Sequence, residues 1–237
     1  RKEVERKAGG STRYNVSQTV LNDIHLFMPS QSEQTQIGDF FQKIDQVIEL
    51  QQKVLDTARA YKQSMLQKMF PQKGEKVPRV RFAGFSGDWE ENRLKEVISS
   101  EFKGKAQLSK LKNGDVEYLD AERLNGGMPY LSNAELDVDY KDILILWDGS
   151  KAGTVYKGFQ GALGSTLKAY KIMKKHSSEF IYQSLKYRQA EIFEKYRTPN
   201  IPHVIKDFTE LFKIKLPSLE EQTQIGNFFE ILDQQIE

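Results

Sequence analysis

Residues 29–49 read PSQSEQTQIGDFFQKIDQVIE, and residues 217–237 read PSLEEQTQIGNFFEILDQQIE. The two segments align without a gap at a constant offset of 188 residues (217 minus 29). They share Pro-Ser, then Glu-Gln-Thr-Gln-Ile-Gly, then Phe-Phe, Asp-Gln and Ile-Glu. This period is too long for a solenoid, whose repeats span roughly 20–50 residues. The repeat therefore indicates two copies of a larger module, and this chain contains parts of both.

Each copy opens with the signature of a helix N-terminus. In the pairs Ser30/Glu33 and Ser218/Glu221, the serine oxygen can accept from a free N–H of the first turn, while the glutamate reaches back to the serine N–H. A proline precedes each serine and disfavours helix before it. We therefore predict that a helix begins sharply in both copies.

Behind the first helix start, apolar residues alternate at spacings of four and three, which is the pattern of a coiled coil over five heptads. These residues are Ile37, Phe41, Ile44, Ile48, Leu55, Ala58, Met65 and Met69, with Gln51 and Lys62 as the two polar interruptions. The second copy begins the same series with Ile225, Phe229, Leu232 and Ile236. A continuous helix of this length would extend roughly 55 Å. Its apolar stripe requires a partner, so we expect these residues to pack against another helix.

Between the two copies lies one globular unit of mixed pattern. Pro71 to Pro78 reads as a linker, and residues 79–216 form the unit. We expect strands at 142–147, near 154–159 and at 166–173, and an amphipathic helix at about 178–197. The predicted fold class is α+β: a mixed α/β domain attached to long coiled-coil spacer helices.

The composition excludes several classes of protein. The 237 residues carry 35 Lys and Arg against 33 Asp and Glu, a net charge of +2, which argues against binding polyanions by bulk charge. The chain has no cysteine, which excludes disulfides, thiolate nucleophiles and cysteine metal sites. It has no apolar run of about 18 residues, so we expect a soluble cytoplasmic protein with no membrane contact. The start at Arg1 and the stop at Glu237 inside an unfinished apolar pattern suggest a fragment.

The positive charge is nevertheless segregated. From Gly149 to Ser178 there is no acidic residue. That stretch contains Lys151, Lys157, Lys168, Lys171, Lys174 and Lys175, and a second basic stretch contains Lys103, Lys105, Lys110 and Lys112. Basic loops suit phosphate contacts, which position a protein on a duplex. The alternative is that these lysines only solvate the domain and protect strand edges, and charge alone favours that alternative.

The turn at 148–153, with sequence Asp-Gly-Ser-Lys-Ala-Gly, also has two interpretations. Its glycines could bring backbone N–H groups to a phosphate, or they could simply serve a hairpin connection, with turn chemistry explaining Asp148. The glycine-rich segment 158–166 lacks the lysine of a nucleotide-binding loop, because Ser165 stands in that place. His25, His176 and His203 have no metal-ligand spacing, and no catalytic constellation is recognisable. We therefore predict no catalytic residue and no metal site.

Several of these motifs together resemble the specificity subunit of type I restriction-modification systems. They are the repeated Pro-Ser-x-x-Glu-Gln-Thr-Gln-Ile-Gly-x-Phe-Phe, the long helix behind it, and the stretch VRFAGFSGDW at 80–89. The segments ILILWDGSKAG at 143–153, GSTL at 164–167 and IPHV at 201–204 also look like the interior of that family's target-recognition domains.

The resemblance implies a division of the chain. Residues 1–28 would be the tail of a first target-recognition domain and 29–70 a spacer helix. Residues 71–78 would be a linker, 79–216 a complete second recognition domain, and 217–237 the truncated start of a second spacer helix.

The resemblance also implies function and partners. Each domain would read half of a bipartite site in double-stranded DNA, while the helices set the spacing and dock methyltransferase subunits and, through them, motor-nuclease subunits. S-adenosylmethionine, ATP and Mg would belong to those partners, so this chain would hold no cofactor and catalyse no reaction. Because only one domain is complete, we also expect that two copies of the chain could pair through their helices.

We predict that loops carry the DNA contacts, with lysines on phosphates and polar side chains at base edges. The candidates are Lys103, Lys105, Lys110, Lys112, Ser150, Lys151, Lys157, Arg188, Arg197, Thr198 and Asn200. Two alternatives remain open: a coiled-coil adaptor that binds protein and not DNA, and an enzyme whose dispersed active site escapes motif analysis.

Overall fold

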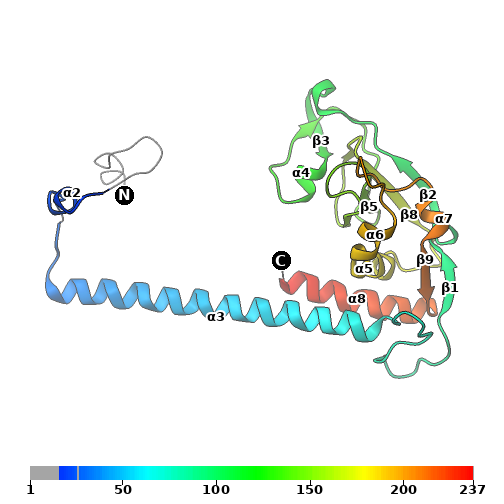
Figure 1. Ribbon diagram of the computed structural model, residues 1–237, viewed down its shortest axis with the longest axis horizontal. Helices are drawn as coiled ribbons and strands as arrows, with labels where there is room; N and C mark the ends of the chain where they lie inside the picture. Colours follow the sequence, from blue (N-terminus) through cyan, green and yellow to red (C-terminus); the bar gives the residue numbers. More distant parts are fainter. Residues whose placement is uncertain (1–15, 26, 237) are drawn as a thin grey trace. The chain divides into compact units, whose positions relative to one another are not determined.

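The computed structural model describes residues 16–25 and 27–236 (Figure 1). The chain divides into two compact units at Leu55/Asp56. The second unit therefore begins inside the long helix and includes more than the predicted domain 79–216. Most of the predicted tail of a first domain lies outside the described residues.

The first unit contains helix α2 (Gln18–Asn22) and most of helix α3 (Gln31–Met69). The predicted start of α3 is confirmed: Ser30 Oγ accepts from the Glu33 N–H at 3.3 Å, and the Gln34 amide donates to the Pro29 carbonyl at 2.8 Å. The apolar positions of this part of α3 remain uncovered in the described chain. Ile37, Phe41, Ile44 and Ile48 are between 37% and 60% exposed.

The second unit combines helices and strands, so the predicted mixed helix and sheet class is confirmed. Its helices are η1 (Leu94–Glu96), η2 (Leu108–Lys110), α4 (Ala121–Leu124), α5 (Ser178–Tyr187), α6 (Gln189–Lys195), α7 (Phe208–Leu211) and α8 (Leu219–Ile236). Its strands are β1 (Glu90–Arg93), β2 (Ile98–Lys103), β3 (Asn113–Leu119), β4 (Leu131–Ser132), β5 (Ile143–Leu146), β6 (Val155–Tyr156), β7 (Ala162–Leu163), β8 (Leu167–Ile172) and β9 (Lys213–Leu216).

The strands form three sheets, with orders β1-β9, β2-β8-β5-β6 and β4-β3-β7. Every pairing among them is antiparallel except β3 with β7. The central strand β5 is buried on both faces. Ile143 and Ile145 belong to a core that also contains α5 and α8 residues, whereas Leu144 and Leu146 belong to a second core with β3 and β7 residues. This explains its continuous apolar sequence, because neither face of the strand meets water.

Strands β1 and β9 pair at the base of the domain, which is the end where it joins α3 and α8. Glu90 pairs with Leu216 and Arg93 with Lys213, so the two ends of a chain segment of more than a hundred residues lie side by side. Helix α3 leads to β1 through the segment 70–89, and α8 begins directly after β9. Both helices are therefore fixed to the same edge of the domain.

Helix α8 lies antiparallel to the last turns of α3 (Figure 1). Ile225, Phe229 and Leu232 are buried in one core with Met69 and Phe70, and Met65 packs against it. Leu55, Ala58 and Ile236 are half-buried. The packing of Met65 and Met69 against α8 is thus observed at the end of α3, whereas a coiled coil along its full length stays a prediction.

The polar seam position Lys62 also has a defined partner. Its ammonium contacts the carboxylate of Asp233 on α8, and the other oxygen of Asp233 accepts from the Gln183 amide of α5 at 2.7 Å. This interruption of the heptad pattern therefore ties three helices together.

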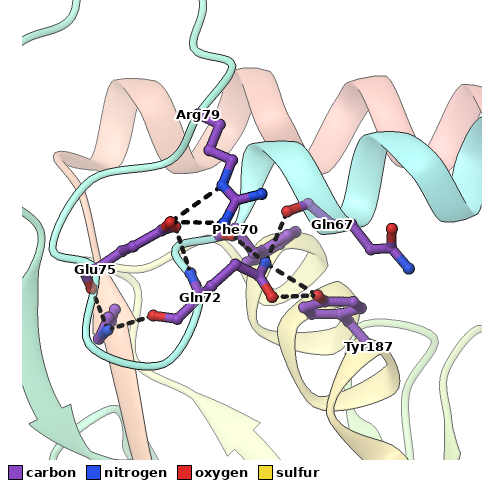
Figure 2. A network of polar contacts seen from close by, with 7 residues as sticks. Gln67, Phe70, Gln72, Glu75, Arg79 and Tyr187 are labelled. Carbon is purple, nitrogen blue, oxygen red and sulfur yellow. Dashed lines mark hydrogen bonds and ion pairs between the residues drawn. The ribbon is translucent and has the colours of Figure 1, made fainter.

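Where α3 ends, aromatic contacts and hydrogen bonds hold the chain against the domain (Figure 2). The Phe70 ring stacks on Phe180 of α5 at 5.3 Å and also contacts Trp89, Tyr187 and Phe229. The Gln72 amide donates to the Gln67 carbonyl at 2.7 Å and to the Tyr187 hydroxyl at 3.1 Å. Glu75 accepts from the Gln72 N–H and from Arg79, and both contacts hold its pKa below the ordinary value.

Two predicted details are wrong. The helix predicted at 178–197 is interrupted at Arg188, which separates α5 from α6. The interruption lets the Arg188 guanidinium lie 4.2 Å from the Phe212 ring and donate to the Lys213 carbonyl. In the second copy of the repeat, Ser218 Oγ caps the Glu221 N–H as predicted, but the Glu221 carboxylate binds Arg81 instead of reaching back to Ser218.

Candidate functional site

Four loop segments meet at one end of the four-stranded sheet: 103–106, 147–153, 164–166 and 197–204. We call them the loop cluster. Backbone hydrogen bonds join them: Gly149 N–H to Pro202 O at 2.9 Å, Val204 N–H to Trp147 O at 2.9 Å, Trp147 N–H to Thr166 O at 2.7 Å, and Ser165 N–H to Ala106 O at 3.0 Å. Segments that are distant in sequence are thereby held as one surface.

The segment 147–153 is the connection between β5 and β6, as the hairpin interpretation requires. Gly153 has a φ of +94°, and a Cβ there would lie 2.9 Å from Ile192 Cγ2 of α6. The turn therefore packs directly on the helix. Arg197 reinforces this contact, because its guanidinium donates to the Ser150 carbonyl at 3.1 Å and to the Phe193 carbonyl at 2.9 Å.

Thr198 has a comparable role in the segment 197–204. Its hydroxyl lies 3.0 Å from His203 Nδ1 and accepts from the His203 N–H at 3.2 Å, and its own N–H donates to the His203 carbonyl. These bonds close a small loop that presents Asn200 and Ile201 at its tip. Both are exposed.

The cluster brings together most of the predicted DNA-binding residues. Lys103, Lys105, Ser150, Lys151 and Asn200 are exposed there. Within the described residues, the ammonium groups of Lys105 and Lys151 have no carboxylate partner within 4 Å. These two cations are therefore available to an anionic ligand, whereas Arg197 and Thr198 shape the loops that present them.

Four other candidates lie outside the cluster. Lys157 forms a 2.6 Å ion pair with Glu179, and both side chains are only 14% exposed. Arg188 is bound to Glu191 and to the Lys213 carbonyl. Neither cation is free for DNA, so we withdraw both from the candidate site. Lys110 and Lys112 are exposed beside the start of β3, where the Lys112 N–H binds Asn133, and no contact that joins the cluster involves them.

The structure adds Asp148 to the loop cluster, and it shows that Lys168 of the acid-free stretch has a partner of its own. Asp148 accepts from Lys103 at 2.6 Å. Lys168 pairs with Glu101 at 2.9 Å and lies 4.4 Å from the Trp147 ring. The position of Asp148 directly after the predicted strand 142–147 was its only sequence signal.

Among the residues that the structure describes, no group of three or more histidine and carboxylate side chains could hold a metal ion. Residues 16–25 and 27–236 also contain no helix that is long and apolar enough to span a membrane.

Comparisons with known proteins identify the family and the fold. Residues 86–237 match the family described as type I restriction modification DNA specificity domain. The chain therefore belongs to this family.

A curated relative, the type I restriction enzyme MjaVIII specificity subunit of Methanocaldococcus jannaschii, is 34% identical over 154 residues. The match covers 62% of this chain and 36% of the relative. The chain thus matches little more than a third of this relative's length.

Solved structures share the fold. The type I restriction-modification system S subunit from M. genitalium matches with a TM-score of 0.75 and 21% identity, over 99% of this chain and 63% of that one. A chain from a structure of complex assembly in the type I R-M system matches with a TM-score of 0.59 and 18% identity, over 85% and 50%.

Proposed function

We propose that this chain acts in a type I restriction-modification complex as the component that recognises DNA, with the domain at 79–216 reading one half-site in a duplex. The observation that carries this proposal is the loop cluster, in which free cations and exposed polar side chains share one rigid surface. Phosphate contacts by Lys105 and Lys151 would set the position on the duplex, and side chains such as Asn200 and Ser150 would meet base edges.

In this proposal the chain is not an enzyme and binds no cofactor. Methylation and cleavage, with S-adenosylmethionine, ATP and Mg, would be carried out by methyltransferase and motor-nuclease subunits acting on DNA in the cytoplasm. The specificity-subunit name of the 34% identical relative supports this division of labour.

Helices α3 and α8 would dock the methyltransferase subunits and set the distance between half-sites. The exposed apolar face of α3 at residues 37–48 supports a docking role, because an apolar stripe on a helix is stable in water only when something covers it.

Duplex binding at two salt concentrations tests the recognition function. A reader that contacts two phosphates through Lys105 and Lys151 should show a slope of log affinity against log salt of roughly −2. Its affinity should then fall about 12-fold between about 50 and about 200 mM salt. A coiled-coil adaptor that binds only protein would show no duplex binding and no slope.

The enzyme alternative is tested by calorimetry with S-adenosylmethionine, for which we expect no binding by this chain alone. Co-purification with candidate methyltransferase subunits, followed by mapping of methylated bases, would then show whether the assembled complex modifies a defined site.

We also propose that, when no methyltransferase subunit covers this face, the chain self-associates through α3. Two copies could cover each other's exposed positions at Ile37, Phe41 and Ile44. Sedimentation at micromolar concentration should show a dimer, and replacement of Phe41 by Lys should return it to a monomer. A wild-type chain that sediments only as a monomer would rule out this arrangement.

A further inference from the structure

Asp148 is the one acidic residue in the loop cluster, as the sequence of its four segments shows. Its backbone position is fixed on two sides. Its N–H donates to the Thr166 carbonyl at 3.2 Å, and it forms a β-bridge with His203. The side chain therefore starts from a rigid point at the end of β5.

The Asp148 carboxylate is also oriented. Lys103, the last residue of β2, donates to Oδ2 at 2.6 Å, and the two side chains are 40% and 48% exposed. The sequence interpretation assigned Asp148 to turn chemistry, but the contact that the structure shows for its carboxylate is with Lys103 on another strand.

Stability does not account for this pair. An ion pair between exposed side chains contributes little to folding, because water and salt screen it and two long side chains lose freedom. On the neighbouring strand β8, a lysine in a similar ion pair also packs on an aromatic ring. Lys168, the β-sheet partner of Lys103, pairs with Glu101 and covers Trp147.

Phosphate binding does not account for Asp148 either. A carboxylate repels phosphate, and here it also occupies a cation that could otherwise contact the backbone. Ionised aspartate is an acceptor only, so the ligand group that suits it is a hydrogen-bond donor. The donors that a duplex presents in its major groove are the amino groups of cytosine and adenine.

We propose that Asp148 and Lys103 together read one C·G base pair, a step that rests on the proposed DNA-recognition function. The cytosine N4 amino group would donate to Asp148, and Lys103 would donate to O6 or N7 of the paired guanine. In the major groove the cytosine amino group and the guanine acceptors lie next to each other. The Asp148 carboxylate and the Lys103 ammonium group also lie next to each other, and they present the matching acceptor and donor. Lys103 also positions the carboxylate and reduces its repulsion of nearby phosphates.

The test is selection of bound duplexes from a fully randomised library by the whole chain at low salt, for the wild type and three variants. Asp148→Asn keeps the shape of the side chain but adds a donor. Lys103→Met removes the donor toward guanine. Glu101→Gln is the matched control, because it removes a carboxylate from the neighbouring ion pair on the same sheet. Thermal melting confirms that each variant is folded.

The wild type should enrich a sequence with a C·G pair at one position. Asp148→Asn should lower discrimination at that position alone, by roughly five- to a hundredfold. Lys103→Met should weaken the same position and also lower overall affinity, whereas Glu101→Gln should leave the selected sequence unchanged.

The failures can be distinguished. If the wild type enriches no sequence, both the recognition function and this assignment are wrong. If the wild type enriches a sequence but Asp148→Asn changes only overall affinity, or acts at an A·T pair, recognition stands and the assignment to a C·G pair is wrong.

Discussion

The guanidinium of Arg81 donates two hydrogen bonds of 2.7 Å, one to each carboxylate oxygen of Glu221, whose side chain is 1% exposed. Arg81 lies at the start of the domain, before β1, and Glu221 lies in the first turn of α8. The same guanidinium binds the carbonyls of Ser86 and Gly87. A single buried contact thus fixes the start of the domain to the start of the helix that follows it.

Replacing Arg81 with Met should destabilise the protein by about 3–5 kcal/mol, because the Glu221 charge would stay buried without a partner. Urea unfolding measures this loss. Arg79→Met is the matched control: its pair with Glu75 is exposed, so the loss should stay below about 1 kcal/mol. Equal losses in the two variants would contradict a special role for the buried pair.

Gly38 and Gly226 occupy the same position in the two copies of the repeat and allow a second matched experiment. A Cβ on Gly226 would lie 3.0 Å from the Phe180 nitrogen and from the Glu179 Cβ, whereas a Cβ on Gly38 would meet nothing within 4 Å. Gly226→Ala should cost about 1–2 kcal/mol in urea unfolding despite the better helix propensity of alanine. Gly38→Ala should stabilise α3 by up to about 1 kcal/mol and slow its amide hydrogen exchange. A loss of stability at Gly38 would contradict the open space beside this residue.

These helix starts are also where prediction from sequence worked best. Ser30 and Ser218 cap their helices at the same distance, and Gln34 and Gln222 bind the preceding proline carbonyl in the same way. Contacts within five residues depend on the local sequence, so a repeated sequence reproduces them. The double burial of β5 was predictable for a similar reason, since its uninterrupted apolar run leaves no polar face.

The sequence could not show which cations are free. Lys157 lies in an acid-free stretch and looked available, but Glu179 reaches it from α5. Arg188 interrupts a continuous helical pattern because its partners, Phe212 and Lys213, lie far along the chain. The loop cluster itself depends on backbone bonds between four separate segments. Such pairings follow from tertiary structure and not from spacing.

His176 provides a test of pH dependence at the contact between the domain and α8. Burial lowers its pKa below the ordinary 6.5, the nearby Lys175 acts in the same direction, and a hydrogen bond with Gln222 opposes them. Below pH 6.5 the unfolded chain therefore takes up a proton more readily than the folded chain does. The free energy of unfolding should therefore fall as the pH drops from 6.5 through the pKa of His176 in the folded chain. Above pH 6.5 the contribution of His176 should be constant. His176→Gln should remove this pH-dependent loss of stability in melting curves between about pH 7.5 and about 5.5. An unchanged pH profile in the variant would exclude His176 as the cause of the loss.

Charge reversal in the loop cluster should weaken duplex binding regardless of sequence. For Lys105→Glu or Lys151→Glu, we expect a loss of affinity together with a salt slope that is shallower by about 1. Lys174→Glu is the control, because Lys174 is exposed but lies outside the cluster. If the salt slope is the same in all three variants, Lys105 and Lys151 do not contact phosphates.

Asn200 should behave differently from the lysines. Because it stands at the tip of the loop closed by Thr198 and His203, Asn200→Ala should change which duplexes are preferred and leave the salt slope intact. Library selection with the variant and the wild type makes this comparison. A uniform loss of affinity with the same preferred sequence would place Asn200 among the backbone contacts.

The pairing of β1 with β9 determines how the domain would respond to mechanical load. Within this pair, a force that separated the end of α3 from α8 would act on the Glu90–Leu216 end before the Arg93–Lys213 end. Antiparallel strands pulled apart from one end lose their hydrogen bonds one after another, so the pair alone would resist weakly. The Arg81–Glu221 bonds and the contact of the Phe70 ring with Phe229 also join the start of the domain to α8, and they would have to break before the strands are loaded. The mechanical strength of the domain therefore resides at its base, outside the sheet that carries the loop cluster, and the surface proposed to read DNA can keep its shape while the helices are strained.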